Sequence, residues 1–230
     1  LQLSACNITS AQVSGDYYDL IERPDGTLAI VISDVSGKGV PASLLASSLQ
    51  ASLRAHCDTC GDPALLIERV NRYLHASTSP EHFATLFLGI YDPISRFLRY
   101  CSGGHDPALL RHSDGRIEEL SNGGLPIGAF DFSEYEEGSA RLAPGDTLFL
   151  YTDGLTEMAD DTDEQFGIDR IKQVLSEHWD LPSEMLIQQM KDQLEKFSGR
   201  SDADDDITLI AAKVSGDKIE NRGNKTIGES

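Results

Sequence analysis

The segment Leu28-Ala29-Ile30-Val31-Ile32-Ser33-Asp34-Val35-Ser36-Gly37-Lys38-Gly39-Val40-Pro41 decides how this chain folds. It begins with an apolar, β-branched run of strand length and continues through a glycine-rich turn into a helix whose first turn suits Pro41. Asp34 therefore lies at the end of a predicted strand, where a scaffold can hold its carboxylate still and open to solvent.

Acidic residues occur beside three further predicted strands, at 17–22, 147–151 and 207–212. They are Asp16, Asp19, Asp153, Asp204, Asp205 and Asp206. Taken singly, such residues are typical of turns or of solvated charge runs. Together, carboxylates held by rigid strand ends are the oxygen ligands that a small dication prefers. Because they occur together, we predict a metal-dependent enzyme.

Short strands and two helical pairs alternate along the chain. Strands are predicted at 1–5, 17–22, 28–33, 83–91, 97–102, 108–111, 117–120, 133–142, 147–151 and 207–214, and helices at 41–56, after Asp62-Pro63, and at 164–178 and 182–197. Hairpins interrupted by helical pairs predict an α+β fold with antiparallel sheets packed together and helices on the outer faces. We expect one domain over residues 1–214 and a polar linker or disordered tail over residues 215–230.

The net charge of −19 narrows the classes of partner. The charge argues against nucleic acid and anionic membranes, because they require basic surfaces, whereas a cation or a basic or neutral protein is compatible. No apolar run approaches membrane-spanning length, and the sequence shows no signal peptide but leaves open an N-terminal targeting segment upstream of Leu1. Cys6, Cys57, Cys60 and Cys101 do not complete a zinc site and are expected to be incidental thiols in a reducing cytoplasm. Since the chain begins at Leu1 in strand-like sequence, we expect a piece of a longer protein.

The residues Gly37-Lys38-Gly39-Val40-Pro41-Ala42 also match the dinucleotide-binding pattern G-x-G-x-x-A between a strand and a helix. However, a second helix follows here, where a βαβ unit would have a parallel strand. Asp34 would also place a negative charge close to the pyrophosphate. Dinucleotide binding is therefore disfavoured.

Seven blocks of sequence occur in the order of a known family, at residues 13–19, 33–42, 102–107, 124–128, 144–146, 151–157 and 205–209. In these blocks the chain resembles the metal-dependent protein phosphatases of the PP2C superfamily, in the bacterial branch of the RsbU and SpoIIE type that regulates sigma factors. The resemblance covers residues 1–214. It implies an α-β-β-α sandwich, in which two antiparallel sheets lie between helical pairs.

The resemblance also implies a site for two Mn²⁺ or Mg²⁺ ions. Asp34 resembles the carboxylate that bridges the ions, and the backbone carbonyl of Val35 would complete one coordination shell. Asp153 and Asp205 resemble the ligands of the second ion, and Asp16 resembles an acidic residue that contributes to the cluster directly or through water. The ions would activate water for in-line attack on phosphoserine or phosphothreonine. Roles for Asp19, Asp204 and Asp206 stay open.

The chain departs from the family in places. Ser36 occupies the position at which eukaryotic-type members have a candidate general-acid histidine, so the group that protonates the leaving alkoxide is unassigned. Lys38 is expected to be a solvated turn residue, although it could assist phosphate binding. We expect His105 to make structural hydrogen bonds rather than to act as a catalyst.

The resemblance implies a cytoplasmic serine/threonine phosphatase domain that is the output module of a signalling protein with an upstream sensor or receiver domain. Its substrate would be a phosphorylated anti-sigma-factor antagonist of the STAS type, in a partner-switching pathway. Two alternatives are a catalytically silent partner-binding module of the same fold and a phosphatase for small phosphate esters. The sequence leaves open whether the domain acts as a monomer or a homodimer.

Overall fold

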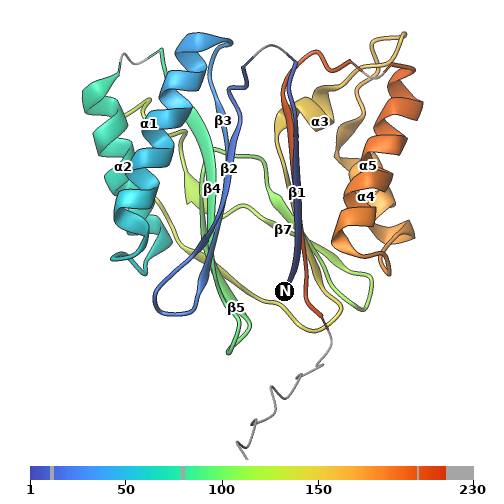
Figure 1. Ribbon diagram of the computed structural model, residues 1–230, viewed down its shortest axis with the longest axis horizontal. Coiled ribbons are helices and arrows are strands. Elements are labelled where there is room, and N and C mark those ends of the chain that lie inside the picture. Colours follow the sequence, from blue (N-terminus) through green and yellow to red (C-terminus); the bar gives the residue numbers. More distant parts are fainter. Residues whose placement is uncertain (11–12, 79–80, 201, 216–230) are drawn as a thin grey trace, which may run out of the picture.

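The computed structural model describes residues 1–10, 13–78, 81–200 and 202–215. Two β-sheets pack face to face, and a helical pair covers the outer face of each sheet (Figure 1). The expected α-β-β-α sandwich is therefore confirmed. Of the expected tail over residues 215–230, all but Ser215 lies outside the described residues.

The first sheet, here called sheet A, has the strands in the order β1-β11-β10-β6-β7. Their bounds are β1 (Gln2–Ile8), β11 (Ile207–Lys213), β10 (Thr147–Tyr151), β6 (Ala108–Arg111) and β7 (Ile117–Leu120). The second, sheet B, has the order β2-β3-β4-β5-β8, and β9 also pairs with β5. Its strands are β2 (Tyr17–Glu22), β3 (Leu28–Val35), β4 (Ala84–Asp92), β5 (Phe97–Gly103), β8 (Gly123–Gly124) and β9 (Gly138–Arg141). The chain begins in sheet A and later returns to it.

The helices follow the predicted pairs. α1 (Val40–Cys57) and α2 (Pro63–Ser77) cover sheet B, whereas α4 (Gly167–Glu177) and α5 (Ser183–Ser198) cover sheet A (Figure 1). Because α1 leads into α2, and β3 pairs with β4 in the antiparallel direction, the glycine-rich turn belongs to no βαβ unit. Among the described helices, none is long and apolar enough to cross a lipid bilayer.

Three apolar cores separate the four layers, and the central strands contribute to two of them. In β3, Ala29 and Val31 pack under α1 and α2, while Ile30 and Ile32 face sheet A. Since side chains alternate across a strand, burial on both faces requires an unbroken apolar run. This explains why the central strands read as continuous apolar segments rather than as alternating ones.

Several details differ from the predicted elements. β1 extends to Ile8, α4 begins at Gly167 rather than at residue 164, and of residues 133–142 only Gly138–Arg141 form a strand. Neither β8, which pairs with β5 in the parallel direction, nor α3 (Asp153–Glu157) was predicted. Each missed element is short. A two-glycine strand and a five-residue helix beginning with Asp-Gly have the composition of turns.

Candidate metal centre

The apolar layer between the two sheets becomes polar at one end. The row formed by Ile30 and Ile32 of β3 continues to Asp34, and the row of Leu148 and Leu150 in β10 continues to Thr152. In the same way, Phe87 of β4 is preceded two residues earlier by Thr85, and Ile210 of β11 by Thr208. Because a strand alternates with period 2, these polar side chains point into the same inter-sheet space. This end of the sandwich contains the predicted site.

Asp34 lies one residue before the end of β3, in register with Thr85 of β4. Its carboxylate is partly buried and faces the negative charges of Asp153 and Asp205. Burial, followed by the repulsion from these two carboxylates, raises the pKa of Asp34 to about 6. Three residues that are far apart in sequence therefore form one electrostatic cluster.

Asp153 is the first residue of α3, directly after β10. Burial and the charge of Asp205 raise its pKa, and the charge of Lys38 partly offsets this. Gly154 is needed at the next position because a Cβ there would overlap the carbonyl oxygen of Asp206. The chain segments that carry Asp153 and Asp205 thus approach each other too closely to admit a side chain at Gly154.

Asp16 is the most buried of the predicted carboxylate ligands, with 8% of its surface exposed. Its Oδ2 atom accepts hydrogen bonds from Oγ1 of Thr208 at 2.7 Å and from Oγ1 of Thr152 at 2.8 Å. Burial, the largest effect, together with the charges of Asp34 and Asp206, raises its pKa to about 8 even though both hydroxyls act in the opposite direction. Asp16 joins the edge of sheet B to sheet A beneath the acidic cluster.

Asp205 lies just before β11 and is exposed, and its Oδ2 atom forms an ion pair with Nζ of Lys38 at 3.1 Å. The same ammonium donates to the carbonyl of Asp204 at 3.1 Å. Lys38 is exposed, as expected for a solvated turn residue, since 61% of its side-chain surface is accessible, and it also places a positive charge beside the acidic cluster. A cavity of about 160 Å³ lies beside this pair, lined by Lys38, Gly154, Glu157, Met158, Asp204 and Asp205.

The remaining predicted acidic residues have structural partners. Asp206 accepts hydrogen bonds from the backbone N–H groups of Ser10 (2.7 Å) and Gly15 (2.8 Å), which hold the segment before β2 against β11. Asp19 forms a bidentate ion pair with Arg54 of α1, and Asp204 pairs with Arg200. These interactions separate Asp19, Asp204 and Asp206 from the metal-ligand candidates.

The carboxylates lie close enough to influence one another's pKa values, but they do not surround a single metal position. Among the described residues, no three His, Cys, Asp or Glu side chains converge as the ligands of one bound ion would. The donor set nevertheless fits Mn²⁺ or Mg²⁺ in two respects. All candidate ligands are hard oxygen atoms, and burial together with the charges of neighbouring carboxylates raises the pKa values of Asp16, Asp34 and Asp153, so a bound dication would favour their ionised forms.

The hydroxyl partners of the cluster and the ion pair between Lys38 and Asp205 were not among the predicted features. Thr85, Thr152 and Thr208 continue the inward-facing rows of their strands, so the period-2 alternation was an available signal for their direction. The order of the strands could not be predicted from the sequence. In sheet A, β1 pairs with β11, and β11 pairs with β10, although β1 lies far from both in the sequence.

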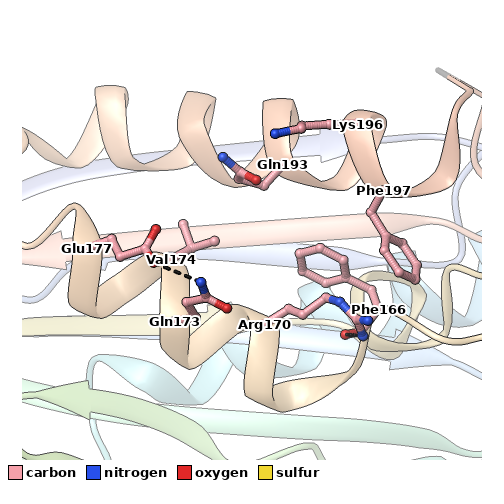
Figure 2. A pocket seen from close by; sticks show the side chains of 8 residues that line it. All are labelled: Phe166, Arg170, Gln173, Val174, Glu177, Gln193, Lys196 and Phe197. Carbon is pink, nitrogen blue, oxygen red and sulfur yellow. Dashed lines mark hydrogen bonds between the residues drawn. The ribbon is translucent and has the colours of Figure 1, made fainter.

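A separate groove lies between α4 and α5, on the far side of sheet A. Figure 2 shows Arg170 beside the ring of Phe197, and Gln173 in a hydrogen bond with Glu177. The groove has a volume of about 270 Å³ and is lined by Phe166, Arg170, Gln173, Val174, Glu177, Gln193, Lys196 and Phe197. Glu177 is the one acidic residue of that lining, so this groove lacks the grouped carboxylates of the inter-sheet site.

Comparison with known proteins places these features in a family. The sequence profile described as Stage II sporulation protein E (SpoIIE) matches residues 24–215. The chain is 31% identical to Protein IcfG of Synechocystis sp., over 91% of this chain and 37% of that protein. It is 27% identical to Phosphoserine phosphatase RsbU of Bacillus subtilis, over 93% of this chain and 63% of that protein. The chain thus spans less than two thirds of either relative.

Solved structures share the architecture. The SiaA-PP2C domain of Pseudomonas aeruginosa superposes with a TM-score of 0.83 at 23% identity, covering 93% of this chain and 86% of that domain. RsbX, whose crystal structure was determined in complex with magnesium, superposes with a TM-score of 0.66 at 18% identity, covering 91% and 92%. At these identities the likeness concerns the fold alone.

Proposed function

The chain belongs to the SpoIIE family of bacterial PP2C-type serine phosphatase domains, and from this premise we propose that it hydrolyses phosphoserine or phosphothreonine on a protein with the help of two Mn²⁺ or Mg²⁺ ions. The observation that carries the proposal is the cluster of Asp34, Asp153 and Asp205, which brings carboxylates from both sheets together; burial and the repulsion within the cluster raise the pKa of Asp34. Grouped carboxylate oxygens of this kind are the ligands that hard dications prefer.

In this proposal Asp34 would contribute to holding both ions, and the Val35 carbonyl would contribute to holding one of them. Asp153 and Asp205 would hold the second ion, and Asp16 would support the cluster directly or through water. When bound, the dications supply Lewis acidity that makes water nucleophilic near neutral pH and positive charge that offsets the phosphate. Gly15 supports the role of Val35, because a Cβ at Gly15 would come within 3.3 Å of the Val35 carbonyl oxygen.

The chain's own residues have three tasks in this mechanism. Strand pairing holds the ends of β3 and β10, so Asp34 and Asp153 would fix the position of the ions and of the attacking water. Asp16 would be ionised in the loaded site, where Thr152 and Thr208 donate hydrogen bonds to its carboxylate. Asp205 would ligate in place of its ion pair with Lys38.

We further propose a phosphorylated anti-sigma-factor antagonist of the STAS type as the substrate, the class that the family resemblance implies. The similarity to RsbU, a phosphoserine phosphatase, over 93% of this chain supports phosphoserine as the group that is hydrolysed. Because the chain covers 63% of RsbU and 37% of IcfG, we propose that an upstream sensor or receiver domain controls it. We place its action in the cytoplasm, in keeping with four free thiols.

One observation favours a second candidate, a catalytically silent module that binds the phosphoprotein without turning it over. Asp205, one of the proposed ligands, forms an ion pair with Lys38, and within the described part of the chain no three carboxylates converge on one point. A protein that never loads metal would have such an arrangement permanently.

Phosphate release from a phosphoserine-bearing STAS protein separates these functions. We expect Mn²⁺-dependent release by the wild type, loss of at least about 100-fold in Asp34→Asn, and wild-type release in Asp25→Asn, which removes an exposed carboxylate at the opposite end of β3. Release from free phosphoserine at a comparable rate would indicate a small-ester phosphatase. Absence of release at any Mn²⁺ or Mg²⁺ concentration, with the phosphoprotein still bound, would establish the binding module.

A further inference from the structure

His105 lies buried between the two sheets, next to the acidic cluster, and the proposed mechanism gives it no task. It follows β5 in the segment Gly104-His105-Asp106-Pro107, and 8% of its surface is exposed. Its backbone N–H donates to Oγ of Ser102 at 3.0 Å, and that hydroxyl donates to the His105 carbonyl at 3.1 Å. The backbone of His105 is therefore fixed before its ring makes any contact.

The imidazole ring joins one strand of each sheet. Its Nε2 atom lies 3.1 Å from the carbonyl oxygen of Tyr151, the last residue of β10 in sheet A. Its Nδ1 atom lies 2.8 Å from Oγ1 of Thr85 in β4 of sheet B. Because a carbonyl can only accept, Nε2 carries the proton, and in a neutral ring Nδ1 then accepts from the Thr85 hydroxyl. Burial lowers the pKa of His105 to about 4, so the ring is neutral at physiological pH.

Both partners of the ring lead directly to proposed metal ligands. Oγ1 of Thr85 lies 3.4 Å from the backbone nitrogen of Asp34, its register partner. Tyr151 is two residues before Asp153, at the point where β10 gives way to α3. A continuous chain of contacts thus runs from Asp34 through Thr85, His105 and Tyr151 toward Asp153.

We propose that His105 is a positioning residue whose ring fixes the separation between Asp34 and Asp153 by holding the ends of β4 and β10 together. This inference rests on the proposed function, in which those two carboxylates share the ions. Both ring nitrogens are engaged with protein groups, so His105 acts through its neighbours and does not exchange a proton with the substrate. Removing a group that holds metal ligands in place typically changes metal affinity by about 10- to 100-fold.

The contacts of the His105 ring with Thr85 and Tyr151, here called the brace, can be broken at two points by substitution. Thr85→Val removes the hydroxyl that joins Asp34 to the ring, and His105→Gln removes the Nδ1 acceptor. Thr85→Ser restores the hydroxyl. His112→Gln is the matched control. Both ring nitrogens of His112 also contact protein groups, Asp146 and Glu118, but His112 lies at the opposite end of β10 from Tyr151.

Mn²⁺ titration calorimetry and kinetics with the phosphoprotein give the first measurement. We expect Thr85→Val and His105→Gln to lower Mn²⁺ affinity and kcat by about 10-fold or more, with KM changed less than about twofold. In Thr85→Ser and His112→Gln, Mn²⁺ affinity and kcat should stay within about threefold of the wild-type values. Wild-type affinity in folded Thr85→Val or His105→Gln would overturn the proposal, and so would an equal loss in His112→Gln.

Amide hydrogen exchange of the metal-free protein gives the second measurement, which does not depend on catalysis. We expect His105→Gln to accelerate exchange about 10-fold or more at both Asp34 and Asp153, and His112→Gln to accelerate it at neither. Unchanged exchange in His105→Gln would overturn the brace. If the wild type releases no phosphate while this exchange pattern holds, the proposed function fails and the brace stands.

Discussion

Oδ2 of Asp16, beside sheet B, accepts a hydrogen bond of 2.7 Å from Oγ1 of Thr208 in sheet A. The two residues are 192 positions apart in the sequence, and the contact forms because β1 and β11, the first and last strands of the described residues, are neighbours in sheet A. It places a buried carboxyl group directly beneath the cluster of Asp34, Asp153 and Asp205. The candidate site is thus assembled by the closure of the whole domain.

The Thr208 hydroxyl can be removed without changing the volume of the side chain. Thr208→Val should lower the free energy of unfolding by about 1–2 kcal/mol, because it leaves a buried carboxyl oxygen with one donor fewer. Urea unfolding of the metal-free protein measures this change, and Thr208→Ser, which keeps the donor, is the control. Unfolding of Thr208→Val at the wild-type urea concentration would contradict the role given to this contact.

Lys38 should compete with a divalent cation for Asp205. Lys38→Gln is expected to raise Mn²⁺ affinity about fivefold, because an exposed ion pair contributes up to about 1 kcal/mol. Arg200→Gln removes one positive charge from the neighbouring Asp204 and is the matched control, with an expected change below about twofold. If both variants gained affinity equally in titration calorimetry, Lys38 would act only through the net charge.

Gly154 allows the segments of Asp153 and Asp206 to meet. Gly154→Ala should destabilise the fold by about 1–3 kcal/mol and weaken Mn²⁺ binding, since its Cβ would force α3 away from the Asp206 carbonyl. Gly61→Ala is the control, because the nearest atom to its Cβ would be Nη2 of Arg23 at 3.9 Å. Thermal unfolding and calorimetry report the two effects. Equal stability and equal Mn²⁺ affinity in Gly154→Ala and Gly61→Ala would contradict the close approach of Gly154 to the Asp206 carbonyl.

The metal-free protein should lose stability as the pH rises from about 4 to about 8. The folded-state pKa values of Asp16 and Asp34 are raised to about 8 and about 6, so the folded state keeps protons that the unfolded state has already released. The stabilisation is present below the unfolded pKa and disappears as the pH passes the folded values. Urea unfolding in the presence of a chelator, over this pH range, measures the slope.

The matched comparison is between Asp16→Asn and Asp25→Asn, which remove the same charge. Asp16→Asn should flatten the loss of stability with rising pH, whereas Asp25→Asn should keep it, because hydrogen bonds from Thr27 lower the pKa of Asp25. An equally steep profile in Asp16→Asn would show that overall charge repulsion, rather than the buried carboxyl group, produces the slope.

The sequence predicted the fold class because its strongest signals are local. The apolar run before Asp34 and the helical spacing after Pro41 each identify an element, and the structure contains both. The contacts between elements that are far apart in the sequence could not be predicted from such local signals. That Asp16 meets Thr208, or that His105 joins Thr85 to Tyr151, depends on the strand order of sheet A and on which end of the sandwich each strand reaches.

Short elements were missed for a different reason. Gly123–Gly124 forms β8 because β5 lies beside it, and a Cβ at Gly123 would overlap the backbone of Ser102. No intrinsic strand preference of glycine predicts this pairing. In α3, Asp153 and Gly154 have turn composition, and the helix exists because β10 ends there and Leu155 is buried against the core of sheet A.

The most direct test of the central claim is the location of Mn²⁺ by anomalous scattering in crystals of this protein grown with MnCl₂. We predict two peaks between Asp34, Asp153 and Asp205, with Lys38 displaced from Asp205, and loss of both peaks in crystals of Asp34→Asn. No peak at this end of the sandwich, with the Lys38–Asp205 ion pair intact at saturating Mn²⁺, would contradict the two-metal phosphatase and leave the binding module as the function of the domain.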